Sequence, residues 1–392
     1  MKPRGVHLQY SFEALGQSGA EIHNPLFELL SAVQQAGSIG HAARQLHQSY
    51  RHVWGSLKRW EEVLGSELVV WAKGQPARLT PFAERLVWAE RQARTRLRPH
   101  VEALRAELSR VFALADDSAL QLLEVFASHD LGLPRLQRLA EDGHALHLSL
   151  RFAGSQEALR CLMTGRCTVA GFHVPRGAGR ASVFARTLRP LLRPGTHKLI
   201  GSHTRCQGLM LGAGLAQAMV RPVAQTVAKN VGNTGSPDSA QGAALLRALA
   251  AGQHRFVNRQ QGSGTRLLLE HLLAEQGLTT SGITGYDTHV EETHVAVAAA
   301  VAAGAADVGL GVEAAAREFG LAFMPLVLED YYLVCLKAAL DTPSVLALRQ
   351  ALASTAWATA LQTLPGYGPQ HAGEVLSLTR ALPWWRYRSR TD

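Results

Sequence analysis

The sequence predicts an α+β domain at the N-terminus, then a long connecting helix, and an α/β domain over most of the remaining chain. Three patterns lead to this prediction. Helix-starting and turn-forming residues punctuate positions 37–81, residues 82–112 contain no glycine, and short apolar strands alternate with helices from position 119 onward. The length of 392 residues exceeds what one hydrophobic core usually serves, and a hydrophobic content of 47% is sufficient for more than one core.

Two short helices and a hairpin account for the N-terminal pattern. Ser38 can cap a helix whose apolar positions recur at helical spacing, and Ser49 can cap a second, longer helix. Residues 67–71 and 77–80 have the composition of two strands, which a turn at 73–76 joins. This order predicts a winged helix-turn-helix, in which the second helix enters the major groove of DNA.

The polar side of the second helix has the chemistry of a DNA-reading surface. Its hydroxyl, imidazole and cationic groups suit base edges and phosphates, and two cations of the hairpin would lie near the sugar-phosphate backbone. The predicted DNA-contacting residues are Ser38, Ser49, Tyr50, Arg51, His52, Ser56, Lys58, Lys73 and Arg78. Residues 1–113 contain 15 Lys and Arg against 10 Asp and Glu, so they supply +5 of the net charge of +9. The alternative is an ordinary globular domain whose basic residues form a solvated face.

Four short blocks carry a family resemblance. The sequences GSI (37–39), AAR (42–44), SYRHVW (49–54) and LTP (79–81) resemble the LysR-type regulators and, more closely, the molybdate-responsive ModE-type regulators. The resemblance covers about the first quarter of the chain and implies a transcriptional regulator that binds double-stranded promoter DNA. The chain lacks the small β-barrel repeats of ModE-type regulators, so their ligand chemistry does not transfer.

The glycine-free segment predicts a long helix with one apolar seam. The seam positions are Leu86, Ala93, Leu97, Val101, Leu104, Leu108 and Val111. We expect Pro99 to kink this helix or to divide it in two, because proline removes one donor from the helical hydrogen bonds. A helix-turn-helix protein needs two copies to span two half-sites, so the seam favours a homodimer or homotetramer over packing on its own chain.

The remaining chain predicts an α/β domain with a mostly parallel sheet and one anion pocket. The expected strands are Gln121–Ala127, His147–Ala153, Val169–His173, Arg255–Asn258, Val308–Gly311 and Tyr331–Leu336. Helix-starting residues follow several strands, at 128–130, 154–155, 262–265 and 292–294. Helix N-termini that meet at the carboxyl edge of such a sheet bind anions. The expected boundaries are 1–82 for the winged domain, 83–118 for the dimerisation helix and linker, 119–365 for the pocket domain and 366–392 for a C-terminal tail.

Blocks spread over residues 119–340 resemble the two-lobed type II periplasmic-binding-protein fold, in particular its cytoplasmic form joined to DNA-binding domains. The most specific block is NRQQGSGTR (258–266), and ASHD (127–130) and GSQEAL (154–159) support it. In related molybdate-binding proteins, serine hydroxyls and helix-start amides hold a tetrahedral oxyanion. The resemblance, together with charged and polar residues in these blocks, implies ligand contacts from Ser128, His129, Ser155, His173, Arg205, Asn258, Arg259, Ser263, Gly264, Thr265, Arg266, Thr293 and His294. The arginines could instead form salt bridges, and the histidines could be structural.

The expected signal is a small anionic effector such as molybdate, tungstate or formate, and no cofactor is required. A larger pterin-type cofactor stays open, because the glycine-rich segment 201–214 and the segment 230–242 could form mobile pocket walls. A cytoplasmic oxyanion or molybdenum-cofactor carrier and a cofactor-biosynthesis enzyme are the alternative functions. The aromatic and basic end at 383–388 is more typical of a packed terminus than of a nucleic-acid platform.

Several function classes find no support in the sequence. A Walker lysine motif, a GxSxG elbow and a paired-carboxylate catalytic loop are absent, which argues against an enzyme. The four cysteines include no CxxC pair, and the 17 histidines show no HxxxH or HExxH spacing, so we expect neither a disulfide scaffold nor a metal site. No run of 18 apolar residues and no signal sequence is present, so we expect a cytoplasmic protein without a membrane partner.

Overall fold

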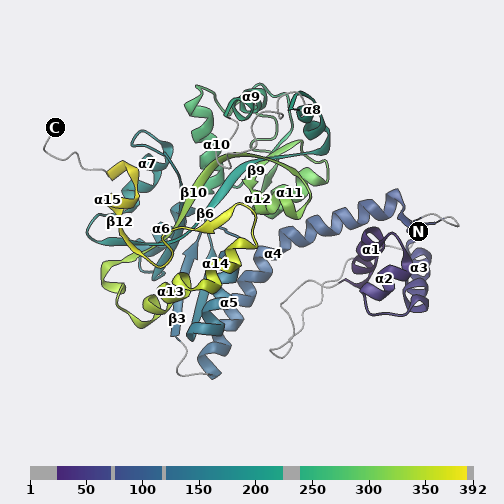
Figure 1. Cartoon of the computed structure of the whole chain (residues 1–392), viewed down its shortest axis with the longest axis horizontal. Coiled ribbons are helices and arrows are strands. Elements are labelled where there is room, and N and C mark those ends of the chain that lie inside the picture. Colours follow the sequence, from purple (N-terminus) through teal and green to yellow (C-terminus); the bar gives the residue numbers. More distant parts are fainter. Residues whose placement is uncertain (1–23, 72–75, 117–120, 224–238, 386–392) are drawn as a thin grey trace. The chain divides into compact units, whose positions relative to one another are not determined.

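The computed structural model describes residues 24–71, 76–116, 121–223 and 239–385. The chain separates into an N-terminal unit that ends at Val87 and a C-terminal unit that begins at Trp88. The predicted order of an α+β helix-turn-helix domain, a long helix and an α/β two-lobed domain is confirmed (Figure 1). Among the described residues, no helix has both the length and the apolar character needed to cross a membrane.

The N-terminal unit contains three helices and a short hairpin. Its elements are α1 (Pro25–Ala36), α2 (Ile39–Gln45), α3 (Tyr50–Leu64), β1 (Val69–Val70) and β2 (Arg78–Leu79). The side chains of Ser38 and Ser49 cap α2 and α3 as predicted. Gly37 and Gly65 end α1 and α3 in the left-handed conformation, with φ of 59° and 63°, which glycine adopts without steric cost. Lys73 lies outside the described residues.

The core of this unit joins all three helices to the hairpin. Leu30, Val33 and Val53 are completely buried, and Leu57 is 1% exposed. Trp60, which the helical pattern places on the apolar side of α3, is instead 36% exposed. The core therefore holds the N-terminal two thirds of α3 against α1 and α2.

Helix α4 (Pro81–Asp116) is the predicted long helix. Thr80 caps it, since its hydroxyl oxygen accepts a hydrogen bond of 3.2 Å from the Ala83 amide. The expected division at Pro99 does not occur, because the helix runs through this position without interruption. A proline removes only one backbone donor, and a helix of 36 residues retains the hydrogen bonds on either side.

One mixed sheet runs through the C-terminal unit. Its strands are β3 (Gln121–Ala127), β4 (Leu146–Phe152), β5 (Val169–Pro175), β6 (His197–Leu211), β7 (Phe256–Arg259), β8 (Val290–Glu291), β9 (Val308–Val312), β10 (Ala322–Leu336), β11 (Tyr367–Pro369) and β12 (Val375–Ser377). The main order is β4-β3-β5-β10-β6-β9-β7-β8, and β11 and β12 pair with β6.

The six predicted strands all exist; five agree with the observed bounds within two residues, and the last covers only part of its strand. Residues 331–336 are the end of β10, a strand of 15 residues. The expectation of a mostly parallel sheet is wrong for the centre. Here β10 lies antiparallel to β5 and β6, and β6 lies antiparallel to β9. The two long strands thus connect a parallel group, β3-β4-β5, to a second parallel group, β7-β8-β9.

Strand β6 has no counterpart among the strands predicted from the sequence. The glycine-rich segment 201–214, which was expected to form a mobile pocket wall, is mostly a buried central strand. Its polar residues Ser202, His203, Arg205 and Gln207 are all completely buried, so they hide the apolar pattern by which a core strand is recognised. Most of the second expected wall, 230–242, lies outside the described residues.

Helices cover both groups of strands. They are α5 (Leu133–His144), α6 (Ser155–Met163), α7 (Val183–Leu188), α8 (Ala213–Val223), α9 (Ser239–Ala250), α10 (Gly264–Glu275), α11 (His294–Ala302), α12 (Glu313–Glu318), α13 (Pro343–Ala353), α14 (Thr355–Gln362) and α15 (Leu378–Ala381). α5 and α13 lie side by side over β3 and β4 (Figure 1). α11 and α12 pack on β7 and β9. Ser354 separates α13 from α14 and caps α14.

The expected C-terminal tail belongs to this fold at least as far as residue 385. β11 and β12 add to the sheet beside β6, and Trp384 is 1% exposed in the core. Tyr367 reaches the buried carboxylate of Asp130 with its hydroxyl, at 3.0 Å. These partners lie far away in the sequence, so no local pattern indicated that the segment is packed. Residues 386–388 of the aromatic basic end lie outside the described residues.

Candidate functional site

The N-terminal part of α3 presents the predicted DNA-reading surface. Tyr50, Arg51 and His52 are exposed in its first turn, and Ser56 is half-buried one turn later. Arg78 is exposed on β2, the second strand of the hairpin. These side chains therefore form an accessible polar face, whereas the hydroxyls of Ser38 and Ser49 accept hydrogen bonds from backbone amides as helix caps.

Lys58 has a different environment from the one predicted. Its ammonium lies 2.7 Å from Glu61 and 5.1 and 5.5 Å from the ring centres of Trp54 and Trp71. Glu61 also accepts hydrogen bonds from the backbone amides at the start of the hairpin. Lys58 thus fastens α3 to the hairpin, and its charge is partly engaged within the protein.

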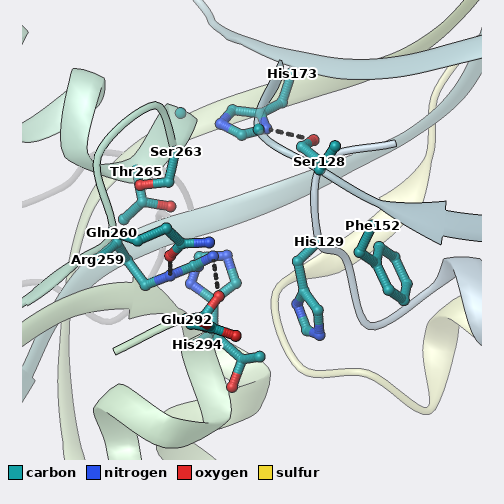
Figure 2. A pocket seen from close by; sticks show the side chains of 14 residues that line it. Ser128, His129, Phe152, His173, Arg259, Gln260, Ser263, Thr265, Glu292 and His294 are labelled. Atoms are coloured by element: carbon teal, nitrogen blue, oxygen red, sulfur yellow. Dashed lines mark hydrogen bonds between the residues drawn. The ribbon is translucent and has the colours of Figure 1, made fainter. Parts of the chain in front are cut away.

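A pocket opens where loops from the two strand groups meet in the C-terminal unit. Its cavity volume is about 90 Å³. The loops after β3 and β4 lie on one side, and those after β7 and β8 on the other (Figure 2). The lining residues are Ser128, His129, Phe152, Ala153, Gly154, His173, Arg259, Gln260, Ser263, Gly264, Thr265, Glu292, Thr293 and His294.

Three helices begin at this pocket. Gly154, Ser263 and Thr293 are the N-cap residues of α6, α10 and α11. The oxygens of Ser263 and Thr293 accept amide hydrogen bonds of 3.3 and 3.0 Å, which leaves their hydroxyl protons able to point into the cavity. Because the N-terminus of a helix carries a partial positive charge, the three starts together favour an anion.

Arg259 adds a full positive charge to the pocket. It is 3% exposed, and its guanidinium donates to the Glu292 carbonyl at 2.6 Å and to the Gln260 amide oxygen at 3.1 Å. Both acceptors are neutral, and among the described residues no carboxylate lies within 4.0 Å of this guanidinium. Burial, followed by the nearby Arg205, lowers the pKa of Arg259 to about 9. The Glu292 carboxylate raises this pKa in part, from beyond contact distance, so the group remains charged at neutral pH and has no carboxylate in direct contact.

Three histidines complete the wall. His173 contacts the Ser128 hydroxyl through Nδ1 at 3.2 Å, as the dashed line in Figure 2 shows. His129 lies against the ring of Phe152, with ring centres 4.8 Å apart, and His294 lies 6.3 Å from His129. Burial lowers the pKa of His173 and of His294, and the nearby arginines lower both further. These two imidazoles are therefore neutral donors or acceptors at neutral pH.

Arg205 lies beneath the pocket instead of lining it. Its side chain is completely buried on β6, where Nε lies 3.0 Å from Glu329 and Nη1 lies 2.8 Å from Asp130. Although burial opposes both charges, His203 and Arg205 hold the pKa of Asp130 below its usual range, and Glu329 and Asp130 raise the pKa of Arg205. The predicted ligand contact is thus replaced by a salt bridge, which was the stated alternative.

Three other predicted residues do not line the cavity. Arg266 contacts Asp287 at 2.5 Å and covers the ring of Tyr286, and the Asn258 amide donates to the Tyr286 carbonyl. Ser155 is buried just behind the wall, and its hydroxyl has no hydrogen-bond partner among the described residues. In the part of the chain that the structure describes, no group of three or more His, Cys, Asp or Glu side chains could hold a metal ion.

Comparisons with known proteins support both parts of the chain. Residues 136–353 match the family model of the PBP superfamily domain, which is more than half of the chain. The chain belongs to the PBP superfamily. Residues 26–84 match the model of the bacterial regulatory helix-turn-helix proteins of the lysR family. The N-terminal part of the chain is thus similar to the helix-turn-helix of lysR-family regulators, and the larger C-terminal part is a PBP domain.

Individual relatives are more distant. The uncharacterized protein YvgK of Bacillus subtilis (strain 168) is 33% identical over 142 residues, and the match spans 36% of this chain and 44% of YvgK. An OxyR variant of Corynebacterium glutamicum bound to H2O2 is 17% identical, with a TM-score of 0.41 over 86% of this chain and 94% of OxyR. CbnR in complex with its target DNA is 17% identical, with a TM-score of 0.39 over 83% of this chain and 98% of CbnR.

Five pocket residues of the PBP domain were not predicted: Phe152, Ala153, Gly154, Gln260 and Glu292. Phe152 and Ala153 end a predicted strand, Gly154 and Glu292 belong to predicted helix starts, and Gln260 lies between a predicted strand and the next helix start. The position in the loop was therefore a usable signal. The residue types were not, because apolar and acidic side chains are unusual in an anion site.

Substitution of Gly264 tests how closely His173 approaches the start of α10. A Cβ atom at this position would overlap the imidazole of His173, so we expect Gly264→Ala to displace the ring and to lower the free energy of unfolding by about 1–3 kcal/mol. In Gly143→Ala, the control on α5, the new methyl meets no neighbouring atom, and we expect a gain of about 0.4–1 kcal/mol. Urea unfolding measures both. Equal stability of the two variants would contradict the close approach of His173 to α10.

Proposed function

We propose that this protein is a LysR-type DNA-binding transcriptional regulator, that its PBP domain binds a small anion such as molybdate, tungstate or formate, and that the anion alters how the helix-turn-helix engages promoter DNA. The observation that carries the proposal is the buried guanidinium of Arg259. It has only neutral hydrogen-bond partners, and it lines the pocket at which three helices begin. A buried charge without a counter-ion is costly, and a bound anion supplies the missing partner.

The size of the cavity favours a small ligand. A volume of about 90 Å³ is several times the roughly 10–15 Å³ that one water molecule requires. It supports a compact oxyanion or carboxylate over the larger pterin-type alternative. Molybdate, tungstate and formate are all complementary to this pocket wall, because each has negative charge and more than one acceptor oxygen in a compact shape.

The aromatic side of the pocket adds a second requirement. His129 and Phe152 face the hydroxyls of Ser263 and Thr265 across the cavity (Figure 2). The effector therefore meets charge and hydrogen-bond donors on one side and ring surfaces on the other. The rings offer no replacement for the water that an anion loses on that side. The free energy of binding therefore favours a ligand whose surface toward the rings is weakly hydrated in solution.

Contacts of α4 offer a route from the pocket to the DNA-reading unit. The guanidinium of Arg96 binds both carboxylate oxygens of Glu291, at 2.5 and 3.1 Å, and Glu291 is the residue before Glu292 of the pocket wall. Arg91 donates to the Glu318 carbonyl and covers the ring of Phe319 at 3.9 Å. Because α4 continues directly from the hairpin, a ligand that shifts residues 291–294 can change the state of this helix.

The same helix supports self-association. Leu104 belongs to the predicted apolar seam and is 44% exposed. We propose that a second copy covers this seam in a homodimer or homotetramer, since two recognition helices are needed to read two half-sites.

Calorimetric titration of the full-length protein with molybdate, tungstate, formate and sulfate tests the effector. We expect saturable binding of at least one anion, and we expect Arg259→Gln to weaken it about 10- to 100-fold, the loss of a charged hydrogen bond. Arg266→Gln is the matched control, because this neighbouring arginine is engaged with Asp287 outside the cavity. Equal loss of affinity in both variants, or no binding by the wild type, would overturn the proposed effector class.

The recognition helix has its own test. Arg51→Ala should weaken binding to DNA from upstream of the protein's own gene and reduce the salt dependence of that binding, because one phosphate or base contact is lost. Gel shifts at several salt concentrations measure both quantities. Arg247→Ala on α9 is an exposed arginine of the PBP domain and should leave them unchanged. Unaltered DNA affinity in Arg51→Ala would show that α3 is not the reading helix.

The coupling route predicts a third phenotype. In Arg96→Gln the anion should still bind, and DNA should still shift, but the effect of the anion on the gel shift should fall or disappear. The matched control is Arg94→Gln, an exposed arginine of α4 whose carboxylate partner, Glu90, lies on the same helix. If the anion alters the shift of Arg96→Gln as it does that of the wild type, the signal does not pass through Glu291.

A further inference from the structure

The buried layer at the pocket carries a balanced set of charges before any ligand arrives. Asp130 and Glu329 are the acids, Arg205 and Arg259 are the bases, and all four side chains are at least 97% buried. An added anion therefore leaves this layer with negative charge in excess, one unit for formate and two for molybdate or tungstate. The helix N-termini offset part of it, and a proton on a nearby titratable group would offset the rest.

His173 and Glu329 form the group best placed to accept that proton. Nε2 of His173 lies 3.7 Å from Oε1 of Glu329, and among the described residues neither atom has a hydrogen-bond partner. His173 lines the cavity, whereas Glu329 is held beneath it by Arg205 and by Gln207. The Ser128 hydroxyl donates to the Tyr331 hydroxyl, so the tautomer with the proton on Nδ1 lets His173 donate to Ser128 and leaves Nε2 as an acceptor. In this tautomer Nε2 and Oε1 are two facing acceptors, and they gain a hydrogen bond when one proton is added between them.

We propose that the pocket takes up one proton together with its anion, and that His173 and Glu329 hold this proton between them. The inference rests on the proposed function and specifies the form of its ligand: an anion that binds with a proton from solvent. In the step, one N–H or O–H bond forms in the pair, and the buffer supplies the proton. No bond of the anion is made or broken.

The charges around His173 and Glu329 determine how anion binding changes the pKa of the pair. Burial and the two arginines lower the pKa of His173, and burial raises the pKa of Glu329. An anion beside Arg259 offsets part of the positive field, so protonation of the pair becomes easier in the complex. The groups that face the pair from each packed element are Ser128 and Asp130 after β3, Arg205 and Gln207 of β6, Arg259 of β7, Tyr331 of β10, Gly264 of α10 and His294 of α11.

This change in pKa makes the affinity for the anion depend on pH. The pair has a higher pKa in the complex than in the free protein, so the anion binds most tightly at low pH. Affinity falls as pH rises from the pKa of the free pair to that of the complex, by up to about tenfold per pH unit for one coupled proton. Outside this window the affinity is constant.

Calorimetry in two buffers tests the proton. The full-length protein is titrated with formate and with molybdate near neutral pH, where both ions stay fully ionised, in PIPES and in imidazole. We expect the heat per mole of anion to differ between the buffers, in proportion to the difference between their ionisation enthalpies. Binding with identical heats in both buffers overturns the inference and leaves the proposed effector class intact. The absence of binding by every anion overturns both.

Variants locate the proton. In His173→Gln and Glu329→Gln, we expect whatever binding remains to lose its dependence on buffer and pH. The control is His371→Gln, because His371 lies 3.1 Å from Glu374 in an exposed pair away from the pocket. If the buffer dependence survives in both pocket variants, the proton lies elsewhere and the assignment is overturned. Even if these buried substitutions prevent folding, the two-buffer measurement on the wild type decides whether a proton is taken up with the anion.

Discussion

The PBP domain depends on one buried cation, Arg205, which joins two acids that lie far apart in the sequence. Its guanidinium lies 2.8 Å from Asp130 and 3.0 Å from Glu329, and all three side chains are completely buried. Loss of one partner from such a group typically costs about 3–5 kcal/mol, because the remaining charge stays buried. Arg205 lies on β6 and Glu329 on β10, the two strands that connect both halves of the sheet. The ion network therefore fixes the frame from which the pocket loops emerge.

A second buried arginine has the opposite environment, and the contrast separates structural from binding chemistry. Arg205 has two carboxylates, which raise its pKa, whereas Arg259 has only neutral acceptors, and burial lowers its pKa to about 9. The charge that the protein leaves unpaired is the one at the cavity. Gln207 connects the two regions, since its amide contacts Glu329 at 2.6 Å and Thr265 of the pocket wall at 3.3 Å. Gln207 therefore connects the pocket wall to the charges that hold the sheet together.

A protein responds to a ligand only if the ligand binds one of its states more tightly than another. Two features of the structure give this difference a physical basis. The pocket wall is divided between loops of both strand groups, and Gly154 and Gly262 meet across it so closely that a Cβ on Gly154 would overlap the opposite carbonyl. The segment behind the wall is fastened to α4 through Glu291 and Arg96. A small displacement of the wall therefore changes contacts of the helix that leads to the DNA-reading unit.

The sequence by itself determined the local elements: the helix caps at Ser38, Ser49, Ser263 and Thr293, the long helix, six of the strands and most of the pocket wall. These features depend on steric and hydrogen-bond preferences within three or four residues, so a sequence pattern records them. Tertiary structure decided which arginine is paired, that 201–211 is a core strand and that residues 367–385 join the sheet. The partners of Arg205 lie 75 and 124 residues away, and only the folded chain brings such charges together.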